Sequence, residues 1–316
     1  DYTDGTASIL LEPQSTNLIT HSEDFSNASW TGGATTATIT ASTNINPSGE
    51  NGTYLVENVT GSQLGGVASV TSGLSYTGSF YVRNVSGSGA ITLRDVNSVA
   101  TPFTATSEWQ RFSVTGAATG AGRLYINVLT TGDIIEVWGA QIEALPYSTS
   151  YIPTSGAIAT RLADVVTGAG DATTFNSTEG VLYAEINTLS QTGTFRQINL
   201  SNGTTSSRVY ISKRASNDNL EFRMENPLGG LNFSFAVDTT GDFVKVAFRY
   251  GVNNFAVFIN GVNKNVSPIG STFPSGTLND LQLSSSINQH FYGKVKSVIT
   301  FNTALTDAEL ECLTTI

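Results

Sequence analysis

The chain has 316 residues, of which 39% are hydrophobic and 13% are charged, and its formal net charge is −10. This length predicts about two domains, and the excess of acidic groups disfavours nucleic acid and anionic lipid as partners. No apolar run reaches the roughly 18 residues that a membrane helix needs. The lone Cys312 excludes an intrachain disulfide. The sequence starts at Asp1 without a signal-peptide core, so we expect either a processed chain or a piece of a longer one.

Hydroxyl side chains dominate the composition, with 43 Thr and 35 Ser. Thr is β-branched and favours strands, whereas the helix formers Glu and Lys are scarce, with 13 Glu and 5 Lys. This composition is typical of an exposed all-β protein. We therefore predict two tandem β-sandwich (jelly-roll) domains and, as described below, a short C-terminal helix.

In the first half of the chain, short alternating segments are separated by clusters of Gly, Asn, Asp and Ser, as in sandwiches and barrels. They predict strands at residues 76–83, 90–94, 109–115, 123–129 and 134–143. Along the first of these, Phe80 and Val82 point to one face while Tyr81 and Arg83 point to the other. One face of each strand is thus expected in a core, and the opposite face meets solvent or a ligand.

Residues 146–170 lose this periodicity and are rich in turn-forming residues, so we place a domain boundary near residue 165. The predicted domains are 1–165, with an opening arm and a linker at its ends, and 166–316. The alternation then returns and predicts strands at residues 181–187, 194–200, 208–213, 219–224, 231–237, 243–250, 254–260, 278–283 and 289–301.

The C-terminus carries the one helical signal in the sequence. Thr306 and Glu309 have the spacing of a capping box before the run 308–313. Upstream of it, Asn260 and Gly261 form the dipeptide that favours tight hairpin turns.

The first domain contains several sequence motifs that follow one another in a recognisable order. Residues 10–19 read LLEPQSTNLI, residues 137–143 read VWGAQIE and residues 147–155 read YSTSYIPTS. With 22–30 (SEDFSNASW) and 160–164 (TRLAD), they resemble a module of phage tail and virion structural proteins. That resemblance covers roughly residues 8–165 and implies a jelly roll similar to carbohydrate-binding modules. It also implies that Trp30, Trp109 and Trp138 are framework aromatics that pack in the core.

The second domain resembles the laminin-G-like, concanavalin A-like sandwich. The phrases that carry this resemblance are EGVLYA (179–184), VKVAFRYG (244–251), FING (258–261), FYGKVKSV (291–298) and NTALTDAEL (302–310). The resemblance implies a fold more than a function, because such sandwiches host lectins, adhesive modules, glycosidases and lyases.

No catalytic constellation stands out. Glycoside hydrolysis normally needs two carboxylates that flank the scissile bond, and the nearest pattern is Glu221-Phe-Arg-Met-Glu225, where Arg223 takes the place of a central Asp. We therefore predict no enzyme and name no catalytic residues. No cofactor is predicted with certainty. Calcium, held by Asp and Asn oxygens as in many modules of these families, stays open without named ligands.

Sugar recognition needs aromatic rings framed by polar and charged side chains. We expect such residues on the strand faces that point away from the core, which in the first domain would form one platform if the strands are neighbours. The candidate ligand-binding residues are Tyr81, Arg83, Arg94, Arg123 and Tyr125 in the first domain and Tyr183, Tyr210 and Arg223 in the second. An ordinary solvated sheet face is the alternative interpretation of the same pattern.

Together these features predict an extracellular, non-enzymatic virion component in a tail fibre, spike or other exposed appendage. Its expected role is multivalent attachment to bacterial surface glycans, as a homo-oligomer (a trimer by analogy with fibres) in contact with other virion proteins. Two alternatives are a purely structural or decoration module without a ligand and, with less support, a polysaccharide depolymerase.

Overall fold

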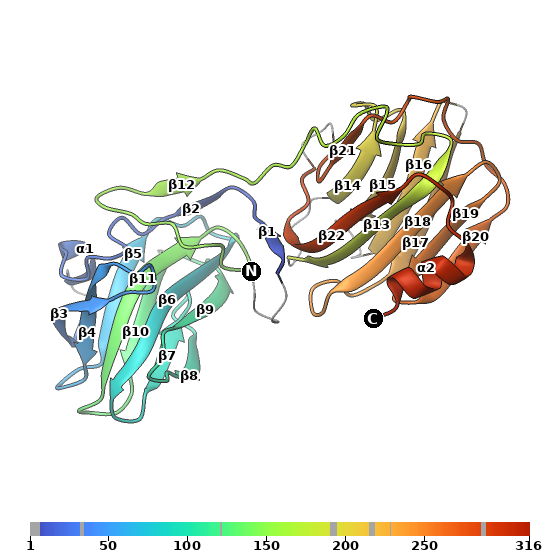
Figure 1. Cartoon of the computed structure of the whole chain (residues 1–316). Coiled ribbons are helices and arrows are strands. Elements are labelled where there is room, and N and C mark those ends of the chain that lie inside the picture. Colours follow the sequence, from blue (N-terminus) through green and yellow to red (C-terminus); the bar gives the residue numbers. More distant parts are fainter. Residues whose placement is uncertain are drawn as a thin grey trace. The chain divides into compact units, whose positions relative to one another are not determined.

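The computed structural model describes residues 7–31, 35–120, 122–189, 195–214, 219–227, 229–285 and 289–316. Within these residues the chain forms twenty-two strands and two short helices, of which α2 (Asp307–Thr314) lies at the C-terminus (Figure 1). The predicted all-β class with a short C-terminal helix is therefore confirmed. No helix of this part of the chain has the length and apolar character needed to cross a membrane.

The chain divides into two compact units. We call Gln14–Leu162 the N-terminal unit, and Ala163–Ile316 together with Asp1–Pro13 the C-terminal unit. The two units meet in the chain between Pro13 and Gln14 and between Leu162 and Ala163.

The opening segment differs from our expectation, because it packs with the C-terminal unit and not with the jelly roll that follows it. Strand β1 (Ile9–Leu11) pairs antiparallel with β22 (Gly293–Phe301), and Leu11 is buried in the C-terminal core. The backbone N–H of Glu12 also donates to the Asp164 carboxylate at 2.8 Å. Sequence patterns could not show this, since the pairing joins strands from opposite ends of the chain.

Two antiparallel sheets build the N-terminal unit. Their orders are β3-β4-β11-β6-β9 and β5-β10-β7-β8, and β2 and β12 form a separate pair (Figure 1). The bounds are β2 Ser15–Asn17, α1 Ala28–Thr31, β3 Thr38–Ile45, β4 Asn51–Glu57, β5 Gln63–Ala68, β6 Ser75–Ser86, β7 Ala90–Arg94, β8 Ala100–Thr104, β9 Gln110–Ala117, β10 Gly122–Val128, β11 Ile134–Glu143 and β12 Ala159–Arg161.

The core of this unit follows the predicted alternation. Phe80 and Val82 are fully buried, while the intervening residues of β6 face the other way. Trp30 closes one part of the core, with its ring centroid 4.8 Å from that of Phe25 and 5.8 Å from that of Phe80. A Cβ atom on Gly66 of β5 would lie 2.6 Å from the Trp30 ring, so this close approach requires glycine.

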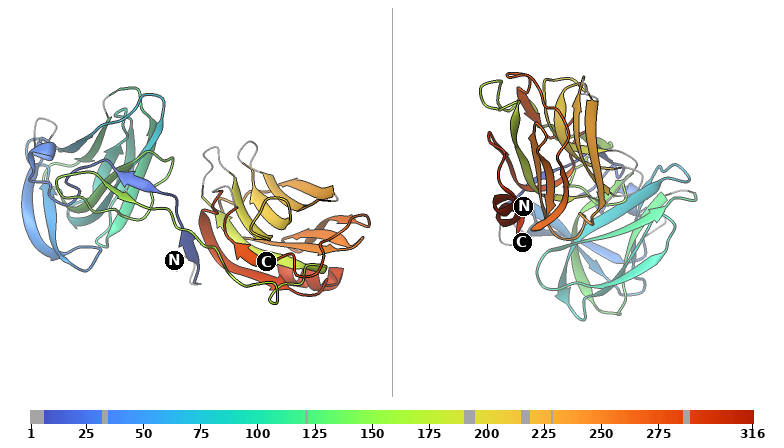
Figure 2. Two further views of the ribbon diagram at one scale, coloured as in Figure 1. Left: turned by 90° about the horizontal axis from the view of Figure 1, so that it is seen from above. Right: turned by 90° about the vertical axis from the view of Figure 1, so that its right-hand side faces the viewer.

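The C-terminal unit is a β-sandwich of a six-stranded and a five-stranded sheet. Their orders are β1-β22-β13-β18-β19-β20 and β17-β16-β15-β14-β21, and Figure 2 shows them as two layers. The bounds are β13 Glu179–Thr188, β14 Arg196–Ser201, β15 Arg208–Lys213, β16 Asn219–Asn226, β17 Gly229–Ala236, β18 Val244–Gly251, β19 Phe255–Ile259, β20 Val262–Ser267 and β21 Asp280–Gln282.

Helix α2 begins with the predicted capping box. Thr306 accepts from the backbone N–H of Glu309, and the Glu309 carboxylate accepts from the Thr306 backbone at 2.7 Å. The helix packs Leu310 against the outer face of the six-stranded sheet. The β19–β20 hairpin turns at Asn260 and Gly261, whose φ angles of 49° and 75° are left-handed, as the Asn-Gly signal predicts.

Candidate functional site

One outer sheet face of the C-terminal unit gathers polar and charged side chains, and we call it the arginine face. Cross-strand register places Tyr210 of β15 opposite Arg223 of β16, and Arg208 opposite Glu225. The intervening residues point to the core, as does buried Phe222. The arginine face consists of Gln197, Arg208, Tyr210, Glu221, Arg223 and Glu225.

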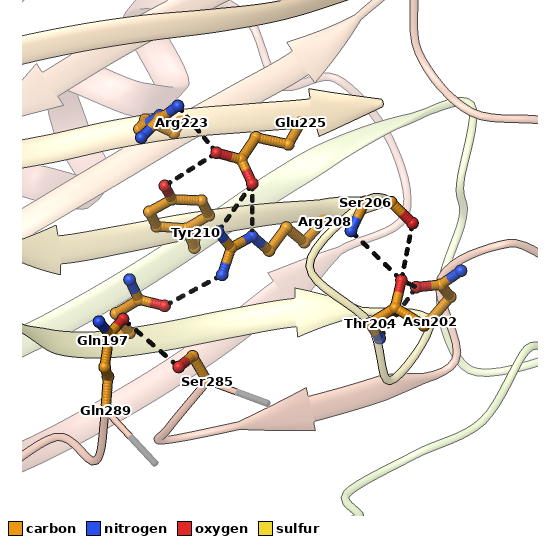
Figure 3. Close-up of polar contacts among 10 residues, drawn as sticks. All are labelled: Gln197, Asn202, Thr204, Ser206, Arg208, Tyr210, Arg223, Glu225, Ser285 and Gln289. Atoms are coloured by element: carbon orange, nitrogen blue, oxygen red, sulfur yellow. Dashed lines mark hydrogen bonds and ion pairs between the residues drawn. The ribbon is translucent and has the colours of Figure 1, made fainter. Parts of the chain in front are cut away.

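Glu225 is the centre of this face (Figure 3). One of its carboxylate oxygens accepts from Nε and Nη2 of Arg208, both at 2.7 Å. Its other oxygen lies 2.8 Å from Nη2 of Arg223 and accepts from the Tyr210 hydroxyl at 3.3 Å. Arg208 also donates from Nη1 to Gln197 at 3.4 Å. Charge-assisted bonds of this kind hold each donor in a fixed direction.

The Tyr210 ring is enclosed by arginines and is only 2% exposed. The guanidinium carbons of Arg208 and Arg223 lie 4.3 and 5.8 Å from its centroid. Burial, partly offset by the charge of Arg208, raises the pKa of Tyr210 to about 12, so its hydroxyl keeps the proton that it donates to Glu225. Tyr210 therefore supports the arginines and offers no open ring face for a sugar.

A shallow pocket of about 160 Å³ opens on this face. It is lined by Phe195, Gln197, Arg208, Tyr210, Glu221, Arg223 and Gln289. The Arg223 side chain is 36% exposed and is the most accessible charged group of the ion-pair network. The pocket thus offers guanidinium donors, amides and one phenyl ring, which suit a polyhydroxylated ligand.

The two carboxylates considered for hydrolysis are both engaged. Glu221 pairs with Arg214 at 2.7 Å and its side chain is 4% exposed. Glu225 is bound by Arg208 and Arg223. A glycosidase needs one carboxyl group free to protonate the leaving oxygen, and neither of these groups presents a free acid to the pocket.

A second polar face lies on the five-stranded sheet of the N-terminal unit, and we call it the tryptophan face. It consists of Tyr81, Arg83, Trp109 and Glu136. Register places Glu136 of β11 opposite Arg83 of β6, and the Arg83 Nε and Nη2 atoms lie 2.7 and 2.6 Å from one Glu136 oxygen. The guanidinium carbon of Arg83 lies 5.0 Å from the Trp109 ring centroid. The half-exposed arginine is thereby fixed over an aromatic ring.

Glu136 is fully buried and holds this arrangement in place. Its second carboxylate oxygen accepts from the Asn44 amide at 2.9 Å and from the Thr53 hydroxyl. Burial opposes ionisation, but the hydrogen bonds from Thr53, Asn44 and Arg83 and the charge of Arg83 hold the pKa of Glu136 below its ordinary value. Glu136 is thus a carboxylate that orients Arg83.

The structure divides the expected first-domain platform between two sheets. Tyr81 and Arg83 lie on β6 of the five-stranded sheet, whereas Arg94, Arg123 and Tyr125 lie on the four-stranded sheet. There, Tyr125 pairs directly with Arg94 across β10 and β7. The predicted faces are correct for all of them, because side-chain alternation is local. The condition for a single platform is not met, because β6 and β10 lie in different sheets.

Two other expectations are corrected by burial. Tyr183 points away from the main core, as predicted, but it is 4% exposed in the apolar cluster with Leu310 of α2. It is a core residue under the helix and not a ligand contact. Trp30 lies in the main core, and Trp138 is also buried, packed against Tyr81 and Tyr151 on the outer side of its sheet. Trp109 is only half-buried and lies next to Arg83, so the expected core position is wrong for Trp109.

Sequence reasoning missed Gln197, Arg208, Trp109 and Glu136 as members of these faces. Their outward strand positions were readable from the alternation, but the partner across the sheet was not. Within the described ranges, His, Cys, Asp and Glu form no group of three or more that could hold a metal ion. Calcium therefore stays a prediction without ligands.

Residues 164–311 match the family model of the concanavalin A-like lectin/glucanases superfamily. A comparison with curated proteins gives no match. Among solved structures, the chain is similar to the CBM40 of a Ruminococcus gnavus IT-sialidase bound to α2,3-sialyllactose, with 17% identity and a TM-score of 0.39 over 48% of this chain and 95% of that one. It is also similar to domains LG4-5 of the mouse laminin α1 chain, with 11% identity and a TM-score of 0.31 over 78% and 90% of the two chains.

A third similar structure is the CBM22 tandem domain of Paenibacillus barcinonensis Xyn10C, with 13% identity and a TM-score of 0.26 over 95% of this chain and 99% of that one. These structural similarities are too low to carry an argument about ligand or activity. The residues matched by the family model include those of the arginine face.

Proposed function

We propose that this protein is a non-catalytic carbohydrate-binding component of a phage virion, displayed on a tail fibre, spike or other exposed appendage. Its role is to attach the particle to glycans of the bacterial surface. The observation that carries the proposal is the arginine face, where Glu225 fixes Arg208 and Arg223 at the edge of a shallow pocket. This face lies in the unit that matches the lectin/glucanases superfamily. The phage assignment is supported by the phrases LLEPQSTNLI, VWGAQIE and YSTSYIPTS.

Binding without cleavage is supported by the ion pairs. Because Glu221 and Glu225 are held by arginines, they organise the pocket and do not act on a glycosidic bond. Arginine forks donate to sugar hydroxyls or to a sugar carboxylate in fixed directions.

Because the pocket is shallow, firm attachment requires many copies of the chain on one particle. A pocket of about 160 Å³ covers little of a glycan, so each contact is weak. Linking several sites in one particle raises the overall affinity by about 10²–10⁴ without any new contact. A homo-oligomer, with a trimer as the simplest fibre-like form, fits this requirement.

The test is binding of the full chain to bacterial polysaccharides on a glycan array and to intact cells. We expect Arg223→Ala to weaken binding about 10- to 100-fold, because one charge-assisted hydrogen bond contributes about 1.5–3 kcal/mol. Lys264→Ala is the matched control, since it removes a positive charge from an exposed position on strand β20. Equal binding by wild type and Arg223→Ala would refute the assignment of this face.

The two alternative functions, a structural module and a depolymerase, predict different experimental results. A correctly folded oligomer that binds no glycan at high avidity would favour a structural or decoration module. Turnover of a surface polysaccharide that is lost in Glu221→Gln and Glu225→Gln would favour a depolymerase.

A further inference from the structure

A second cavity of the C-terminal unit lies on its other sheet, away from the arginine face. It is a groove of about 670 Å³ on the outer side of the six-stranded sheet, compared with about 160 Å³ for the pocket of the arginine face. We call it the lysine groove and define it by Glu185, Asn187, Asp242, Phe243, Lys294 and Lys296. Its size falls within the range of about 300–1,000 Å³ that is usual for small-ligand sites.

Strand β13 explains why this face is half covered and half open. At its outward positions, Val181 and Tyr183 are apolar and lie under helix α2. The next outward positions, Glu185 and Asn187, are polar and line the groove. The helix covers only the apolar part of the strand, and the remaining polar part is left as the groove floor.

One wall of the groove is fixed by hydrogen bonds to the segment that connects β17 and β18. The Asn187 amide donates to the Gly241 carbonyl at 2.6 Å. The backbone N–H of Thr188 donates to the Thr239 carbonyl at 2.7 Å, and the two threonine hydroxyls lie 2.6 Å apart. A ligand would therefore meet a wall that is already ordered, which reduces the entropic cost of binding.

The lining combines opposite charges with an aromatic ring. The Lys296 amine lies 4.2 Å from the centroid of the Phe243 ring and 3.8 Å from a Glu185 oxygen. Asp238 also lines the groove, but it accepts from the backbone and hydroxyl of Thr240. The side chains supply ammonium donors, carboxylate acceptors and an amide, and neither charge sign dominates. Such a mixture suits hydroxyl groups, each of which donates and accepts, better than it suits a strongly charged ligand.

We propose that the lysine groove is a second carbohydrate site, which binds a neutral oligosaccharide. This inference rests on the proposed function, since it extends carbohydrate binding to a second face of the same unit. The C-terminal unit then has two sites on opposite sheets, so a single copy contacts two glycan chains or two stretches of one polymer.

The experiment follows side-chain amide signals in NMR spectra of the ¹⁵N-labelled full chain. Asn187 reports on the lysine groove and Gln197 reports on the arginine face. The neutral probes are maltohexaose, cellohexaose, chitohexaose, xylohexaose and mannohexaose, each at millimolar concentration. Oligogalacturonate serves as the anionic comparison.

We expect at least one neutral probe to shift the Asn187 signal and Lys294→Ala or Asp242→Ala to weaken that response about tenfold or more. Lys264→Ala is the matched control on the same sheet, and Arg223→Ala leaves the Asn187 response unchanged. Probes that shift only Gln197, with loss of all binding in Arg223→Ala, would overturn the second site and leave the proposed function intact. A response of Asn187 to oligogalacturonate alone would overturn the neutral ligand class. Absence of any response, together with a blank glycan array, would overturn both proposals.

Discussion

Replacing Glu225 with Gln tests the electrostatic organisation of the arginine face. The change keeps the shape of the side chain but removes the charge that binds Arg208 and Arg223. The Arg208 side chain is 9% exposed, so it would be left as a nearly buried charge beside a second arginine. Removing one partner of a buried ion pair costs about 3–5 kcal/mol. Because the Glu225 side chain is 23% exposed, we expect the lower end, about 3 kcal/mol.

The distribution of tryptophans allows the effect to be assigned to one unit. Trp30, Trp109 and Trp138 all lie in the N-terminal unit, so tryptophan fluorescence follows the unfolding of that unit. Circular dichroism follows the strands of both units. For a unit of this size, about 3 kcal/mol corresponds to a decrease in Tm of about 6–12 °C. We expect Glu225→Gln to lower the Tm of the transition seen by circular dichroism alone and to leave the tryptophan transition in place.

Two further variants make this test sharp. Glu311→Gln removes the same charge from an exposed position of helix α2 and should leave both transitions unchanged. The double variant Arg208→Met with Glu225→Leu removes the pair as a whole and should recover most of the lost stability. A Tm of Glu225→Gln within about 2 °C of wild type would refute the reasoning. An equal shift of the tryptophan transition would refute it as well.

Four other predictions follow from the buried contacts. Because folding lowers the pKa of Glu136, its ionised carboxylate stabilises the N-terminal unit at pH values above the ordinary glutamate pKa of about 4.3. This stabilisation is lost as the pH falls through the folded-state pKa. The difference in unfolding free energy between wild type and Glu136→Gln, followed by tryptophan fluorescence in urea, should therefore be constant above about pH 5 and shrink in more acidic solution. We propose the tryptophan face as a further candidate glycan surface, where Trp109→Ala should weaken binding about 2- to 10-fold and glycan should quench tryptophan fluorescence only when that face is occupied. Tyr183→Ala should destabilise the C-terminal unit by about 3–5 kcal/mol in denaturant titration while its glycan affinity stays unchanged in native buffer. Thr306→Ala should lower the stability of the same unit by about 1 kcal/mol, because it removes the cap of α2.

Each of these four predictions would be refuted by a specific result. If the difference in unfolding free energy between wild type and Glu136→Gln grows in acid, the folded unit does not stabilise the ionised carboxylate of Glu136. Full glycan affinity without Trp109 would remove the tryptophan face from the binding surface, and a stable Tyr183→Ala variant with lost glycan affinity would restore that tyrosine as a ligand contact. An unchanged unfolding free energy for Thr306→Ala would mean that the cap contributes nothing to the C-terminal unit.

The accuracy of the sequence predictions depended on whether a feature is local. Alternation in 76–83 and 208–213 predicted which side chains leave the core, and β6 and β15 lie at these positions. The capping box of Thr306 and Glu309 likewise depends on neighbouring residues and predicted where α2 begins. These features need no knowledge of the remaining chain.

The composition of the sites depends on pairings between distant segments, and there the sequence was insufficient. Arg83 was a candidate from its own strand, but the carboxylate that fixes it comes from β11, 53 residues later in the sequence. Tyr183 had the correct orientation, and only the docking of α2 buried it. The lysine groove has the same origin, because Glu185 and Lys296 become neighbours only when β13 pairs with β22.

Because each face is assembled from different distant segments, the arginine face and the lysine groove of the C-terminal unit also differ in chemistry. On the arginine face, two guanidinium groups bind the Glu225 carboxylate, so this ion-pair network is rigid and its outermost donor is Arg223. In the lysine groove, the Lys296 amine lies 3.8 Å from a Glu185 oxygen and over the Phe243 ring, so its donor is an ammonium group beside an aromatic ring. The two proposed sites carry unlike donors, so under these proposals the target would be a heterogeneous polysaccharide whose unlike sugars bind to different faces. A homopolymer that saturates both Asn187 and Gln197 signals with equal affinity would contradict this view.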